Sequence, residues 1–181
     1  MKRLFVFLGM SIILVFLLKG FLYRSTVHYD EVGERGLITL TDAKLIAEIQ
    51  KEVAGKDLNF DEIVEISSKI TNENLKFTID KASSDPNELI KTGKANCVGY
   101  SALFNSIANH IIIHQSKDNI KAKHLVGKLD FLGVDIHQFF KSSFFKDHDF
   151  NSIENIETGE AIYIDPTVSD YLWINEVSLK K

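Results

Sequence analysis

The sequence predicts an α+β fold in which N-terminal helices are followed by an antiparallel sheet, with a transmembrane helix before the domain. Three observations indicate this class. Apolar side chains recur at helical spacing from about residue 41 to residue 116, and strand-like runs separated by turn residues occupy residues 121–166. Residues 4–23 are almost continuously apolar. We therefore expect three parts: an anchor or signal segment over 1–23, a linker over 24–40 and a single α+β domain over 41–181.

Composition narrows the classes of protein that fit the chain. Its 181 residues are 45% hydrophobic and 25% charged, as in ordinary single-domain globular proteins. The net charge of −4 gives no sign of a nucleic-acid partner. A single cysteine excludes an internal disulfide and a cysteine-rich zinc site. We expect no cofactor and no metal.

The first 23 residues have the composition of a membrane anchor. Lys2 and Arg3 precede the apolar run 4–23, whose 20 residues would form a helix of about 30 Å, enough to cross a bilayer if Lys19 reaches the headgroups. A cleaved signal peptide is the alternative, although the small residues of a cleavage site are missing. Either reading keeps Lys2 and Arg3 cytoplasmic and predicts an extracytoplasmic domain, periplasmic or at the cell surface, or secreted after cleavage.

Three helices are expected before the cysteine. Residues 24–40 have no clear period and are interpreted as the linker. Thr41 is a plausible N-cap for the first helix, and Asn59 with Glu62 resembles a capping box for the second. Pro86 suits the first turn of a short third helix, and Gly93 suits its exit.

The cysteine begins a fourth helix, and strands follow. Asn96 is a good N-cap, which places Cys97 in the first turn, and an apolar stripe runs on at four-residue spacing. Residues 121–131, 146–153 and 161–166 are typical of strands, and Thr158-Gly159 favours a hairpin turn between the last two. The aromatic segment 134–145 fits a helix or a strand.

Cys97 is either a small buried hydrophobe or a nucleophile. A thiol at a helix N-terminus lies near unpaired N–H groups and the positive end of the helix dipole, and both favour the thiolate. Catalysis also requires an imidazole to pair with the sulfur and a third group to orient the imidazole. The choice therefore depends on the histidines.

One histidine has a matching carboxylate in the sequence. His148 opens one expected strand and Asp165 closes the next, so a hairpin would bring their side chains together. The other histidines offer less. His124 begins a strand without a comparable acid partner downstream, and His137 and His28 lie in the ambiguous segment and the linker. His110 and His114 have a metal-binding spacing, but they are interpreted as polar surface.

These motifs together resemble the transglutaminase-like superfamily. The resemblance covers about residues 60–170 and is carried by "GKANCVGYSALF", the pair Val126-Gly127, His148 and the run Asp165-Pro166-Thr167. It implies that residues 41–181 form a transglutaminase-like domain, an α+β fold of the papain-like class. In that fold Cys97 would be the nucleophile, His148 the general base and acid, and Asp165 the orienting carboxylate. The sequence departs from the pattern of many relatives at Ala95-Asn96 before the cysteine, and at Phe150, where a Trp is common.

The resulting functional hypothesis is a membrane-anchored thiol enzyme that attacks peptide or carboxamide bonds of a protein or peptide substrate through an acyl-enzyme on Cys97. Hydrolysis by a cysteine peptidase or amidase is favoured over protein-glutamine acyl transfer, because crosslinking requires a site that excludes water. Two alternatives stay open: a catalytically silent tethered binding or scaffold domain of the same fold, and a cell-wall-cleaving cysteine endopeptidase.

Overall fold

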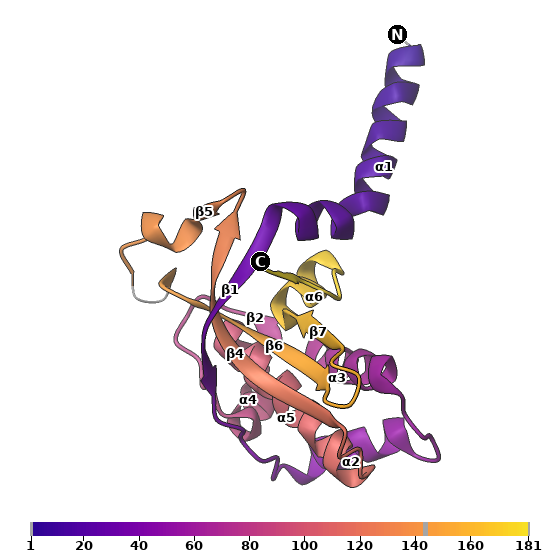
Figure 1. The fold of residues 1–181 in the computed structure, drawn as a ribbon, viewed down its shortest axis with the longest axis vertical. Coiled ribbons are helices and arrows are strands. Elements are labelled where there is room, and N and C mark those ends of the chain that lie inside the picture. Colours follow the sequence, from indigo (N-terminus) through magenta and orange to yellow (C-terminus); the bar gives the residue numbers. More distant parts are fainter. Residues whose placement is uncertain (1, 143–144, 181) are drawn as a thin grey trace.

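A computed structural model describes residues 2–142 and 145–180 and confirms the α+β class (Figure 1). Its helices are α1 (Lys2–Thr26), α2 (Ala43–Val53), α3 (Phe60–Asn74), α4 (Pro86–Thr92), α5 (Cys97–His114), α6 (Pro166–Leu172) and the 3-10 helix η1 (Ile136–Phe139). Its strands are β1 (Val27–Arg35), β2 (Lys76–Phe77), β3 (Lys94–Ala95), β4 (Ile120–Phe131), β5 (Val134–Asp135), β6 (His148–Asn155), β7 (Ala161–Ile164) and β8 (Ser178–Leu179).

The described residues form one large sheet in the order β7-β6-β4-β1-β8, with β5 paired to β4. The pairs β1–β4, β4–β6 and β6–β7 are antiparallel, as the sequence predicts for the last three long strands. A parallel pairing between β1 and β8 was not expected. The ambiguous aromatic segment contains β5 and the 3-10 helix η1.

The segment interpreted as a linker contains a strand of this sheet. β1 lies between β4 and β8, so the order of elements is not simply helices and then strands. Its sequence, VHYDEVGER, has no clean alternation because only Tyr29 is fully buried and a bulge interrupts the register with β4 between Glu31 and Gly33. A half-exposed, bulged strand gives a weak periodic signal, which explains why residues 24–40 resemble a linker.

The helix termini follow the predicted capping chemistry. Asn59 and Glu62 form the complete capping box of α3, and Gly93 ends α4 with a left-handed φ of 65°. Asn96 caps α5, so Cys97 is the first residue of that helix. The cap of α2 is Asp42, whose side chain accepts the N–H of Leu45, and not Thr41.

Two apolar clusters hold the layers together. The larger one packs α2, α3, α4 and α5 against one face of the sheet, with Leu45, Ile63, Phe104 and Ile107 almost completely buried. The smaller one contains Tyr29, Leu125, Phe150 and Val177. Because side chains alternate along a strand, consecutive residues of β6 contribute to different faces of the sheet.

The predicted membrane anchor is wrong. Within residues 2–142 and 145–180, no helix combines the length and the apolar character that crossing a membrane requires. The localisation deduced from an anchor is therefore withdrawn as well. The apolar run is only part of α1, which continues through Lys19 and Arg24 to Thr26 and packs its C-terminal part on the domain. Figure 1 shows that the N-terminal part of α1 projects from the body, while its C-terminal part lies beside α6.

Candidate functional site

Cys97 lies at the buried start of α5. Asn96 accepts a hydrogen bond from the backbone N–H of Gly99 at 3.3 Å, which fixes the first turn of the helix. Cys97 is 9% exposed and is not in a disulfide. The first N–H groups of a helix have no acceptor within it, so this turn provides donors and a positive dipole end next to the sulfur.

His148 and Asp165 form the contact that the sequence predicts. Nε2 of His148 lies 2.6 Å from Oδ2 of Asp165, and the His148 side chain is 16% exposed whereas that of Asp165 is completely buried. Asp165 also caps α6, because its Oδ1 accepts the backbone N–H groups of Thr167 at 2.9 Å and Val168 at 3.2 Å. The carboxylate is therefore held by the fold independently of the histidine.

Charge and hydrogen bonding set the protonation of this pair. Burial alone would lower the pKa of His148, but the Asp165 carboxylate and then Cys97, as hydrogen-bond partner and charge, raise it well above the usual value. Burial alone would raise the pKa of Asp165, but the His148 charge and hydrogen bond, with hydrogen bonds from Tyr29 and the Val168 backbone, lower it. The site therefore favours an imidazolium beside a carboxylate.

The tautomer follows from this geometry. An ionised carboxylate can only accept hydrogen bonds, so Nε2 of His148 carries a proton and donates it to Asp165. Nδ1 is then the ring nitrogen available for the thiol of Cys97, the third member of the predicted set. Cys97 and Asp165 both raise the pKa of His148, so the structure brings the three predicted residues close together.

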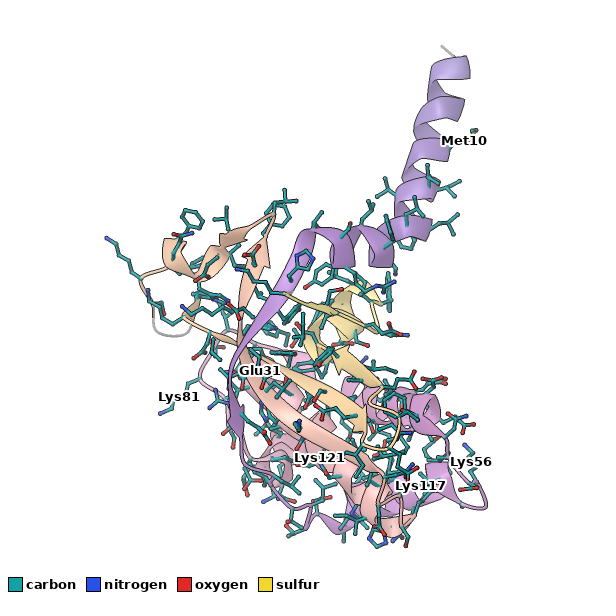
Figure 2. All side chains as sticks on the ribbon, in the orientation of Figure 1. Met10, Glu31, Lys56, Lys81, Lys117 and Lys121 are labelled. Atoms are coloured by element: carbon teal, nitrogen blue, oxygen red, sulfur yellow. The ribbon has the colours of Figure 1, made fainter. Side chains whose placement is uncertain are left out.

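Gly127 allows β4 and β6 to approach closely at the histidine. Gly127 is paired with His148 of β6 on one side and with Glu31 of β1 on the other. Glu31 is labelled in Figure 2 and shows where this part of the sheet lies. A Cβ on Gly127 would lie 2.7 Å from a ring carbon of Phe150 and 2.9 Å from the backbone oxygen of Asp30. Phe150 is fully buried, and its ring lies 5.0 Å from that of Tyr29 beside the site.

A second histidine–aspartate pair, which the sequence does not reveal, lies next to the first. Nε2 of His124 is 2.8 Å from Oδ1 of Asp149, and the guanidinium of Arg35 binds both carboxylate oxygens, with Nη2 at 3.2 Å from Oδ2. His124 therefore does have an acid partner. Burial would raise the pKa of Asp149, but these two partners lower it. The register of β4 against β6 brings His124 and Asp149 together, and this register cannot be deduced from the spacing of residues in the sequence.

Two tyrosines complete the surroundings of Asp165. The Tyr29 hydroxyl donates to Oδ2 of Asp165 at 2.7 Å, and the Tyr23 hydroxyl lies 2.8 Å from that of Tyr29. The Tyr29 ring also meets the His148 ring edge-on, with 5.9 Å between centroids. Sequence analysis missed both tyrosines because they belong to segments interpreted as anchor and linker.

The remaining histidines lie outside this arrangement. The rings of His110 and His114 on α5 are tilted at 44° to each other, with 4.2 Å between centroids. No group of three or more metal-binding side chains occurs in the part of the chain that the structure describes. Nδ1 of His137 lies 2.8 Å from the backbone oxygen of Phe145, and His28 is in β1.

Comparison of the chain with protein-family models, with curated proteins and with solved structures finds no match.

Proposed function

We propose that the chain is a cysteine hydrolase that cleaves a peptide or carboxamide bond through an acyl-enzyme on Cys97. The observation that carries the proposal is the 2.6 Å contact between His148 and Asp165 beside a cysteine that begins a helix. The same three residues carry the resemblance to the transglutaminase-like superfamily, and membership of that superfamily is part of the proposal. A buried cysteine with a purely structural role would need neither an ionised histidine nor an acid to orient it.

Each residue has a distinct role in the proposed reaction. The Cys97 thiolate attacks the carbonyl carbon, forming a C–S bond while the carbonyl π electrons move to oxygen, where the first-turn N–H groups of α5 stabilise the negative charge. When the intermediate collapses, the C–N bond breaks and the imidazolium of His148 gives its Nδ1 proton to the leaving amine. Asp165 holds the ring and stabilises its cationic form throughout.

Water then resolves the thioester. The neutral His148 takes a proton from water, the resulting hydroxide attacks the carbonyl carbon, and the C–S bond breaks to release a carboxylic acid and the thiolate. Hydrolysis is preferred to crosslinking because the His148 side chain keeps 16% of its surface exposed, so that solvent reaches the ring.

Acylation by p-nitrophenyl acetate tests the proposal. We expect a burst of one p-nitrophenol per chain at pH 6–7, with one acetyl group located on Cys97 by mass spectrometry. Cys97→Ala should abolish the acetylation, and His148→Gln should reduce its rate by roughly 100-fold or more, as for loss of a general base. His114→Gln serves as the matched histidine control, because His114 is exposed and outside the site. Equal rates in His148→Gln and the unmodified chain would instead favour a catalytically silent domain.

A further inference from the structure

The carboxylate of Asp165 receives a hydrogen bond that the proposed reaction does not require. Oδ2 accepts from both Nε2 of His148 at 2.6 Å and the hydroxyl of Tyr29 at 2.7 Å. Tyr29 and Asp165 are both completely buried. A second donor on the same oxygen competes with the imidazole for its electron density, so it affects the group that orients His148.

The direction of the hydrogen bond between Tyr23 and Tyr29 follows from the bond between Tyr29 and Asp165. Tyr29 has a single hydroxyl proton and gives it to Asp165, which as a carboxylate can only accept. The 2.8 Å contact between the two tyrosine hydroxyls must therefore have Tyr23 as donor and the Tyr29 oxygen as acceptor. A hydroxyl that accepts a hydrogen bond becomes a stronger donor, so Tyr23 strengthens the bond from Tyr29 to Asp165.

Protonated tyrosines are required for this chain of donors, and the surroundings keep them so. Burial and then the charge of Asp165 raise the pKa of Tyr23 and the pKa of Tyr29 far above the usual tyrosine value. Neither hydroxyl ionises at physiological pH as a result. The polar hydrogens of both residues thus remain available to the triad.

Tyr23 belongs to α1, which makes this chain of hydrogen bonds a connection between two parts of the fold. The same helix packs on the C-terminal end of α6: Lys19 Nζ lies 4.7 Å from the centroid of the Trp173 ring, and the Phe16 ring is 6.2 Å from it. Trp173 caps α6, whose other end is capped by Asp165. The helix α1 therefore contacts Trp173 at the C-terminal end of α6 directly, and it is linked to Asp165 at the other end through Tyr29.

We infer that Tyr29, and Tyr23 acting through it, are positioning residues of the triad, and that they link the docking of α1 to the state of the His148–Asp165 pair. The inference rests on the proposed function of that pair. The chain of donors reads Tyr23 to Tyr29 to Asp165, with His148 as the second donor to the same carboxylate oxygen. The two tyrosines adjust how strongly the acid holds the imidazolium, without touching substrate.

The titratable groups around the pair come from several elements. Tyr23 of α1 and Tyr29 of β1 face Asp165, and Cys97 of α5 faces His148. Asp149 follows His148 on β6 but points to the other face with His124 and Arg35. Removal of the Tyr29 hydroxyl leaves Cys97 and these groups in place, and it makes the carboxylate a better acceptor for the remaining donor. The imidazolium of His148 should therefore be held more tightly.

The test compares three tyrosine-to-phenylalanine variants in the full chain. Tyr29→Phe and Tyr23→Phe each remove one hydroxyl of the chain and keep the ring. Tyr163→Phe is the matched control, because Tyr163 packs on the same apolar cluster and its hydroxyl makes no hydrogen bond to any residue in the described part of the protein. The readout is the titration midpoint of the His148 imidazole by NMR, with its resonances identified by their loss in His148→Gln.

We expect the midpoint to rise by roughly 0.5–1 pH unit in Tyr29→Phe and by about half as much in Tyr23→Phe, and to stay unchanged in Tyr163→Phe. The alkaline limb of p-nitrophenyl acetate acylation against pH should move by the same amounts. A His148 midpoint equal to that of the unmodified chain in both Tyr29→Phe and Tyr23→Phe would overturn the inference. Equal shifts in all three variants would overturn it too, since they would reflect packing alone.

The NMR titration separates this inference from the proposed function. If Cys97 proves unreactive although the His148 midpoint shifts in the expected order, the tyrosines position the pair and only the hydrolase proposal fails. If Cys97 is acetylated in a His148-dependent manner and no midpoint shifts, the hydrolase proposal stands and the positioning role is excluded.

Discussion

His148 and Asp149 are consecutive residues of β6, yet each belongs to a different histidine–aspartate pair. His148 contacts Asp165 at 2.6 Å, and Asp149 contacts His124 at 2.8 Å. Strand alternation directs the two side chains to opposite faces of the sheet, so two similar pairs exist a single residue apart. Cys97 raises the pKa of the histidine in the first pair, and the two pairs should respond differently to substitution.

Neutralising the triad acid separates its chemical role from its structural one. In Asp165→Asn the side-chain oxygen can still accept the N–H groups of Thr167 and Val168, so the cap of α6 is kept while the negative charge is lost. We expect the acylation rate to fall by roughly 100-fold to 10,000-fold. The free energy of unfolding of this variant should fall only by the contribution of the ion pair with His148, because the cap is retained. Asp165→Ala loses the cap as well and should cost about 1–2 kcal/mol more. Equal stability of the two variants would contradict the capping role.

Breaking the second pair should affect stability more than reactivity. His124→Gln leaves the buried Asp149 carboxylate with only Arg35 as a charged partner, and the Asp149 side chain is 1% exposed. We expect a loss of about 1–3 kcal/mol in the free energy of unfolding, because a buried charged acceptor loses a partner. The rate of Cys97 acetylation per folded molecule should stay within a few-fold. A variant that folds normally but no longer reacts would assign the base to His124.

The His148–Asp165 pair should stabilise the fold over a limited pH range. The lowered pKa of Asp165 contributes stability that is present above the ordinary aspartate value, about 3.9, and is lost as pH falls through the native value. The raised pKa of His148 contributes stability that is present below about 6.5 and is lost as pH rises through its native value. The pair therefore contributes most between about pH 4 and pH 6.5.

Subtracting two stability profiles isolates this contribution. The free energy of unfolding is measured in urea from pH 3 to pH 9 for the unmodified chain and for Asp165→Asn. Their difference should be largest in the window given above and decline on both sides. A difference that is constant with pH would indicate that the two groups do not interact as an ion pair.

Gly127→Ala tests the close approach of the strands at the site. The new Cβ would meet the Phe150 ring at 2.7 Å and the backbone of Asp30 at 2.9 Å, and backbone cannot move aside as a flexible side chain can. We expect a loss of about 1–3 kcal/mol in the free energy of unfolding, in the range of overpacked cores. Gly133→Ala is not a suitable control, since its φ of 87° is strained for alanine. Gly36→Ala is suitable, because a Cβ there meets nothing within 4 Å.

The sequence contains enough local information for the helices and for the triad. Caps at Asn59, Gly93 and Asn96 are decided by chemistry within a few residues, and the structure has them where they are predicted. His148 begins β6 and Asp165 directly follows β7, the antiparallel strand joined to β6 by a short hairpin, so their proximity also follows from nearby sequence. These features required no knowledge of the tertiary fold.

Features that depend on distant pairing could not be predicted in the same way. β1 joins the sheet only because β4 and β8 accept it on either side, and its own sequence has little periodicity. Asp149 meets His124 through strand register, and Tyr29 meets Asp165 across 136 residues. An apolar run such as 4–23 predicts a membrane span by hydropathy, which takes no account of a helix that continues past the run and packs on α6.

Asp165 both caps α6 and contacts His148, and these two roles affect how the sequences of relatives are interpreted. Because this side chain begins α6 as well as orienting His148, selection for folding alone would preserve a capping residue, aspartate or asparagine, at the position in a lineage that had abandoned catalysis. Within the described residues, the Cys97 side chain makes no hydrogen bond to the backbone that would support the fold. Substitutions at this position would therefore accumulate once catalysis is lost. Divergence at the cysteine, with a capping residue retained, would therefore distinguish inactive descendants from working enzymes.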